Sequence, residues 1–157
     1  MKMMKRLLIL FTLVLISAGA LIASAASGYT PFSYKNFRLE LPSGTHTSVT
    51  AAKAVMKNSP LRLGFTLIVD KDAKASSDRA MRLCNALVRE MDVKHGSEAW
   101  RVTVGGMKGA MAEGVIEGSR ISLLVLSTGS GYLKLIAIDS GSNATCVDHV
   151  MKSVRRQ

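Results

Sequence analysis

The chain has 157 residues, with 21 Lys and Arg against 11 Asp and Glu, a formal net charge of +10 at pH 7. This length suits one domain behind a leader, and two cysteines are too few for a disulfide-built scaffold. Aromatic residues make up 5% of the chain and the basic residues are spread along it. This excludes a nucleic-acid partner, which requires a basic stripe with stacking rings.

Residues 1–25 are predicted to be a secretory signal peptide. A basic start over residues 2–6 precedes an apolar stretch over residues 7–22. Ala23 and Ala25 then occupy the −3 and −1 positions of an A-x-A cleavage site, the third part of such a signal. We therefore expect an exported protein, periplasmic or secreted. The alternative is an uncleaved helix over residues 7–26, since about 20 residues can cross the hydrocarbon core.

Cleavage after Ala25 removes three basic residues, which leaves 18 against 11 acidic ones and a net charge of +7. A clearly basic exported protein is attracted to anionic surfaces. The charge therefore suggests an acidic or envelope-associated partner, an anionic glycan, or peripheral contact with an anionic membrane.

Residues 26–35 are expected to form an extended N-terminal arm, and residues 36–157 a single α+β domain. Phe37, Leu39 and Leu41 alternate with charged residues, which predicts a half-buried strand. Residues 45–58 are also interpreted as strand. The stretch "LRLGFTLIVDK" over residues 61–71 is a further strand, after a turn at Pro60.

Two amphipathic helices are predicted. The first follows a cap at Ser76 or Ser77, has Asp78 in its first turn, and ends before Gly96. The second follows a cap at Ser142 or Asn143 and is expected to include the terminal basic run. Each helix has one apolar face, formed in the first by Ala80, Leu83, Cys84, Leu87, Val88 and Met91, and in the second by Val147, Val150, Met151 and Val154.

Between the helices, residues 100–104, 109–118, 120–127 and 132–139 read as antiparallel strands joined by Gly-rich hairpin turns. The stretches "ISLLVL" and "LKLIAI" are apolar at consecutive positions, which is typical of strands covered on both faces. The predicted fold is therefore α+β, an antiparallel sheet with a helix on each side, or α/β/α sandwich.

This layering bears on the two cysteines. Export places Cys84 and Cys146 in an oxidising compartment, where they can form a disulfide. Helices on opposite sides of a sheet are separated by about 20 Å, two layer spacings, whereas a disulfide needs Cα atoms within about 7 Å. The layering thus argues against a Cys84–Cys146 bond, and pairing is left open.

The order of elements resembles the PsbP-like family, the fold of the PsbP photosystem subunit and the Ran-binding Mog proteins. The similar stretches are "YKNFRLELPSG", "SSDRAMRLCNALVREM", "VTVGGMKGAMAEGVIEG", "GYLKLIAID" and "CVDHVMKSV", within residues 33–155. The resemblance implies an α/β/α sandwich that docks on a larger partner and is usually not catalytic. It also implies that bacterial members are often exported. No binding residue of the family aligns with a motif here.

No catalytic constellation, cofactor motif or metal motif emerges from the residues. Asp70 and Asp72 lack a third ligand, and Cys146 with His149 lacks the remaining ligands of a zinc site. We expect a non-enzymatic exported module that docks on a macromolecular partner. The alternatives are a basic module for anionic membrane or glycan surfaces, and an unrecognised hydrolase that joins a Ser or Cys to a His and an acid.

Overall fold

The structure is a computed structural model of the chain. It describes residues 28–50, 53–58, 61–69, 76–141 and 144–157. The predicted signal peptide, Asp70, Asp72 and the cap residues Ser142 and Asn143 lie outside these residues.

The larger sheet is antiparallel, with seven strands in the order β3-β4-β5-β9-β8-β7-β6. Its strands are β3 (His46–Val49), β4 (Lys53–Asn58), β5 (Leu61–Val69), β6 (Trp100–Val104), β7 (Met107–Ile116), β8 (Ser119–Ser127) and β9 (Gly131–Asp139). Two-residue turns join β6 to β7 at Gly105–Gly106 and β7 to β8 at Glu117–Gly118, and all four turn residues have positive φ. Such turns match the twist of the flanking strands. The strands expected in this region are confirmed, and the stretch 45–58 that was interpreted as strand contains two strands, β3 and β4.

A smaller sheet has the order β1-β2-β10, from β1 (Tyr29–Tyr34), β2 (Phe37–Pro42) and β10 (Arg155–Arg156). It corrects two expectations. Residues 29–34 are not a free arm, because β1 pairs with β2 along its whole length. The terminal basic run does not continue the helix, because Arg155 and Arg156 pair with β2 instead.

The first helix, α2 (Ser77–Glu90), confirms its prediction closely. Ser76 is the N-cap, and its hydroxyl accepts a hydrogen bond from the backbone N–H of Arg79. The backbone N–H of Ser76 donates in turn to the hydroxyl of Tyr132, at 3.2 Å. This buried tyrosine in β9 therefore fixes the start of the helix against the sheet. Met91 is the C-cap, and Asp92 has positive φ.

The second helix, α3 (Ala144–Ser153), also presents its predicted apolar face. Val147, Val150, Met151 and the following Val154 are all buried. The helix packs on β2 and β9.

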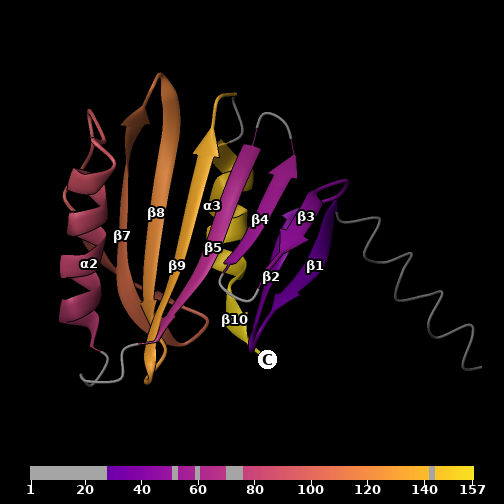
Figure 1. Cartoon of the computed structure of the whole chain (residues 1–157), viewed down its shortest axis with the longest axis horizontal. Helices are drawn as coiled ribbons and strands as arrows, with labels where there is room; N and C mark the ends of the chain where they lie inside the picture. Colours follow the sequence, from indigo (N-terminus) through magenta and orange to yellow (C-terminus); the bar gives the residue numbers. More distant parts are fainter. Residues whose placement is uncertain (1–27, 51–52, 59–60, 70–75, 142–143) are drawn as a thin grey trace, which may run out of the picture.

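The apolar residues form two clusters, one on each face of the larger sheet. One lies between this sheet, α3 and the smaller sheet. The other lies beneath α2. Figure 1 shows α2 beside β7, and α3 behind the larger sheet next to β9, which it contacts. The predicted α+β class and the flanking helices are confirmed; the smaller sheet, which shares a layer with α3, was not expected.

Strand β8 is covered on both faces, as its consecutive apolar residues predicted, since residues 121–126 are all buried. In β9 the prediction holds for one face only. Ile136 and Ile138 face the α2 side and are half-buried, because α2 packs on β7 and β8 rather than on β9.

The two cysteines are free thiols in this structure. Cys84 is buried in the cluster beneath α2, whereas Cys146 packs against the cluster on the opposite face. The two cysteines therefore lie on opposite faces of the sheet, which is the arrangement that argued against a bond between them.

Candidate functional site

Cys146 and His149 were noted in the sequence as two possible zinc ligands. Both lie on α3, next to β1. The ring of Tyr29 stacks on the ring of His149 with centroids 3.9 Å apart. Burial raises the pKa of the Tyr29 hydroxyl, and the neighbouring Cys146 raises it further. Burial also raises the pKa of the Cys146 thiol, although its hydrogen bond with Tyr29 opposes the shift. The thiol therefore stays protonated and is a poor nucleophile.

Glu40 in β2 joins Tyr29, Cys146 and His149 to form a cluster of four side chains. Its Oε2 lies 2.8 Å from Nε2 of His149, and its Oε1 lies 3.7 Å from Nη2 of Arg155. The backbone N–H of Glu40 donates to the hydroxyl of Ser153 at the end of α3, at 2.8 Å. The contacts of Glu40 with His149 and Ser153 connect the smaller sheet with α3, and its contact with Arg155 joins β2 to β10, so the cluster has a clear structural role.

The other two histidines of the chain lie elsewhere in the fold. His46 lies in β3, and His95 has positive φ in the loop after α2. Within the described part of the chain, no three His, Cys, Asp or Glu side chains are grouped so that they could hold a metal ion.

The largest cavity that we describe is a groove of about 690 Å³ between α3 and strands β6 to β8. Leu124 and Met151 form part of its floor and are almost fully buried. Trp100 lies at its margin and is 39% exposed, one of the two large apolar side chains most exposed among the described residues.

The polar margin of this groove consists largely of ion pairs. Arg120 lies 2.9 Å from Glu113, and Lys152 lies 2.7 Å from Asp148. The groove thus combines an apolar floor, an exposed tryptophan and a balanced charged rim, the composition of many protein-binding surfaces.

Strand β6 separates the groove from a second, smaller cavity. This cavity, of about 310 Å³, lies on the other side of β6 and is lined by Ser77, Arg101, Val102, Thr103, Lys108 and Gly109. Arg101 is paired with Asp78 of α2 at 2.7 Å, and both side chains are exposed. The face of β6 toward the groove is therefore apolar, and the face toward the smaller cavity carries Arg101 and is basic.

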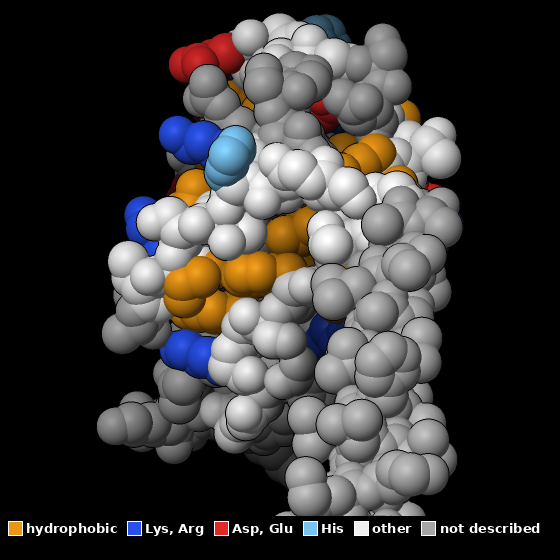
Figure 2. Space-filling view, turned by 90° about the vertical axis from the view of Figure 1, so that its right-hand side faces the viewer, with side chains coloured by type: hydrophobic (Ala, Val, Ile, Leu, Met, Phe, Trp, Pro, Cys, Tyr) orange, Lys and Arg blue, Asp and Glu red, His pale blue; other side chains and the backbone are white. Residues whose placement is uncertain are grey.

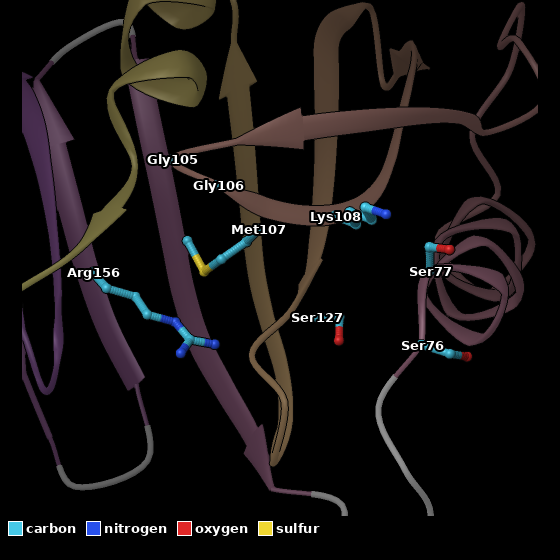
Figure 3. Close-up of a pocket in the computed structure, with 8 residues that line it drawn as sticks. All are labelled: Ser76, Ser77, Gly105, Gly106, Met107, Lys108, Ser127 and Arg156. Atoms are coloured by element: carbon cyan, nitrogen blue, oxygen red, sulfur yellow. The ribbon is translucent and has the colours of Figure 1, made fainter.

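A third cavity, of about 510 Å³, opens where the Gly105–Gly106 turn meets the start of α2. Figure 3 shows Arg156 reaching in from one side, and Ser76 and Ser77 at the start of α2 on the other. Its lining residues include two cations and no acid: Ser76, Ser77, Gly105, Gly106, Met107, Lys108, Ser127 and Arg156. A guanidinium nitrogen of Arg156 donates to the carbonyl of Thr128.

Apolar side chains also reach the surface on the side of the molecule formed by β1 and β3 (Figure 2). Val49 of β3 is 55% exposed there. We assign no site to this side.

The sequence did not predict the groove or the Glu40–His149 contact. Both depend on where α3 lies over the sheet, which no local pattern specifies. The spacing of Cys146 and His149 did place these residues on one helix face. The only hint of the groove was Trp100, the single tryptophan, on an otherwise half-polar strand.

No helix in the described ranges has the length and apolar character needed to cross a bilayer. This finding does not cover the leader, which lies outside those ranges.

Comparisons with known proteins bear on the fold. No family model matches the chain, and no curated protein matches it in sequence. Among solved structures, it is similar to the cyanobacterial PsbP of Synechocystis, CyanoP, with a TM-score of 0.57 and 11% identity over 83% of this chain and 93% of that one.

It is also similar to a protein of Bacteroides thetaiotaomicron, with a TM-score of 0.53 and 16% identity over 83% of this chain. The match spans only 49%, or about half, of that protein's length. At these identities the likeness shows the fold alone. The chain therefore has a PsbP-like α+β fold, as the resemblance implied.

Proposed function

We propose that this protein is an exported, non-enzymatic binding module that docks on a macromolecular partner through the groove between α3 and β6–β8. The single observation that carries the proposal is this groove of about 690 Å³, with an apolar floor and with Trp100 at its margin. Tryptophan contributes disproportionately to the free energy of protein association when a partner excludes water from it.

The hydrolase alternative has less support. Cys146, His149 and Glu40 do contain the residue types of a nucleophile, a base and an acid. However, the thiol has a raised pKa and the histidine ring is stacked on Tyr29. None of the three cavities described above is lined by any of these residues.

Docking is tested by photo-crosslinking in intact host cells. A benzophenone amino acid replaces Thr145, which is exposed at the groove, or Lys57, which is exposed on β4 and serves as the matched control. We expect a discrete cross-linked species from position 145 only. Identical products from both positions, or none from position 145, would contradict docking at the groove.

Export is tested by the intact mass of the protein recovered from its host. A mass that matches residues 26–157 indicates that the leader is removed. A mass that retains residues 1–25 indicates an anchored protein, whose partners belong to membrane complexes.

One observation favours a second function, attachment to anionic surfaces. The cavity of Figure 3 has Lys108 and Arg156 in its lining and no acidic residue. Attraction between such a site and anionic lipid weakens with salt. Co-sedimentation with phosphatidylglycerol vesicles at low salt, reduced by Lys108→Gln and unaffected by Lys57→Gln, would support it. Absence of binding at low salt would remove it.

A further inference from the structure

The open edge of the larger sheet is the feature that carries a further inference. The sheet ends at β6, which pairs with β7 on one side and has no strand beyond it among the described residues. An edge strand of this kind presents unpaired backbone N–H and C=O groups, to which an extended segment of another chain can pair.

The register identifies which backbone groups are available. Val104 and Met107 flank the two-residue turn, and Val102 pairs with Gly109 and Trp100 with Met111. Directly opposed residues alternate between hydrogen-bonded and non-hydrogen-bonded pairs, and the pair that closes a two-residue turn is hydrogen-bonded. The N–H and C=O of Arg101 and Thr103 therefore point away from β7, toward the open edge.

The two faces of β6 determine which side chains an added strand must carry. Successive side chains of a strand point to opposite faces of the sheet. On one face an added strand meets the groove, next to Trp100 and Val102. On the other face it meets the smaller cavity, next to Arg101 and Lys108.

We propose that the partner docks by adding an extended segment to the open edge of β6, with apolar side chains in the groove and acidic side chains toward Arg101 and Lys108. This rests on the proposed docking function and names the partner's binding element. The guanidinium of Arg101 lies 2.7 Å from the carboxylate of Asp78, and both side chains are exposed. An acidic side chain of the partner would compete with Asp78 for this guanidinium. The basic net charge of the chain favours the same partner chemistry.

The probe is a library of random ten-residue peptides displayed on phage, selected on the protein recovered from its host. We expect the enriched peptides to alternate apolar and acidic residues. Synthetic copies are then bound to the protein, and amide hydrogen exchange is followed by NMR. Exchange of Arg101 and Thr103 is expected to slow at least tenfold, whereas Val102, already bonded within the hairpin, serves as the internal control.

A backbone variant gives an independent test. Thr103→Pro removes one outward N–H and leaves the bonds between β6 and β7 intact, as proline is tolerated at edge positions whose N–H faces outward. We expect it to weaken peptide binding at least tenfold, while Lys57→Gln leaves binding unchanged. The exchange measurement on the unmodified protein still decides the matter if the proline variant does not fold.

The proposal is overturned if no peptide is enriched over the blank support. It is equally overturned if bound peptides leave the exchange of Arg101 and Thr103 unchanged. Cross-linking distinguishes this failure from failure of the docking function. If the cross-linked product from position 145 still forms in the Thr103→Pro protein, the partner docks at the groove without adding a strand to β6.

Discussion

The carboxylate of Glu40 lies 2.8 Å from Nε2 of His149, and this contact joins β2 to α3 across 109 residues of sequence. Tyr29 of β1 stacks on the face of the same imidazole. Both strands of the β1–β2 hairpin therefore meet the distant helix α3 at one side chain, and His149 joins α3 to the smaller sheet.

The Glu40–His149 contact should show a measurable coupling energy. Both side chains are partly exposed, so solvent screens the pair and we expect about 0.5–1 kcal/mol. A double-mutant cycle with Glu40→Ala and His149→Ala, followed by urea unfolding, measures it. The exposed pair Asp148–Lys152 is the matched control and should couple by about 0.3–0.5 kcal/mol. A coupling of zero for Glu40 and His149 would contradict the structure.

Gly105 should tolerate no side chain. A Cβ there would lie 2.3 Å from the carbonyl oxygen of Val154, and the residue has a φ of +54°. Gly105→Ala should therefore lower the free energy of unfolding by about 2–4 kcal/mol, from the backbone conformation and the overlap together.

The neighbouring glycine provides the control. Gly106 has a φ of +77° but has open space where its Cβ would lie. Gly106→Ala should cost only the conformational part, about 1 kcal/mol. Equal losses for the two variants would show that β10 does not approach the turn as described.

The two thiols should differ in reactivity. Burial raises the pKa of the Cys84 thiol to about 12 and leaves it no exposed surface. Cys146 is half-buried, with a raised pKa. Only the thiolate reacts with iodoacetamide, so at pH 8 we expect slow labelling of Cys146 and labelling of Cys84 only after unfolding. Mass spectrometry of the digested protein reads both; equal rates in the native protein would contradict this.

The Cys84 thiol should also make stability depend on alkaline pH. Its pKa rises from 9.0 to about 12 on folding, so the folded state retains the proton more strongly. The resulting stabilisation is complete below pH 9 and is lost as the pH rises toward 12. Its upper limit is about 4 kcal/mol, from three pKa units. Between pH 8 and 10.5, urea unfolding should lose stability more steeply in the unmodified protein than in Cys84→Ala. Parallel slopes would refute the assignment.

The helices and central strands could be predicted because their signals are local. The apolar spacing from Ala80 to Met91 and the cap at Ser76 describe α2 without any tertiary contact. The consecutive apolar residues Leu123 to Leu126 of β8 even indicated that both faces of the sheet are covered. The likeness to PsbP-like proteins rested on the same order of elements.

The smaller sheet could not be predicted because its signals are not local. Residues 29–34 carry little pattern and become a strand only because β2 pairs with them. Arg155 and Arg156 look like the end of a helix, yet they pair with Arg38 and Phe37, which lie more than a hundred residues earlier. The groove follows from this arrangement, since α3 packs mainly on β2 and β9 and leaves the groove between itself and β6 to β8, although it also touches β6.

The pairing of β5 with β9 has a kinetic consequence. It brings Val69 to Gly131 and Leu61 to Asp139, with α2 and three strands in the intervening chain. By contrast, β6 to β9 form from consecutive hairpins, and β3 to β5 pair with their neighbours in the chain. Because a long loop must close before such a distant contact can form, it adds to the barrier. The two groups of hairpins should therefore form first, and their joining along β5 and β9 should limit the rate at which this protein reaches its native state.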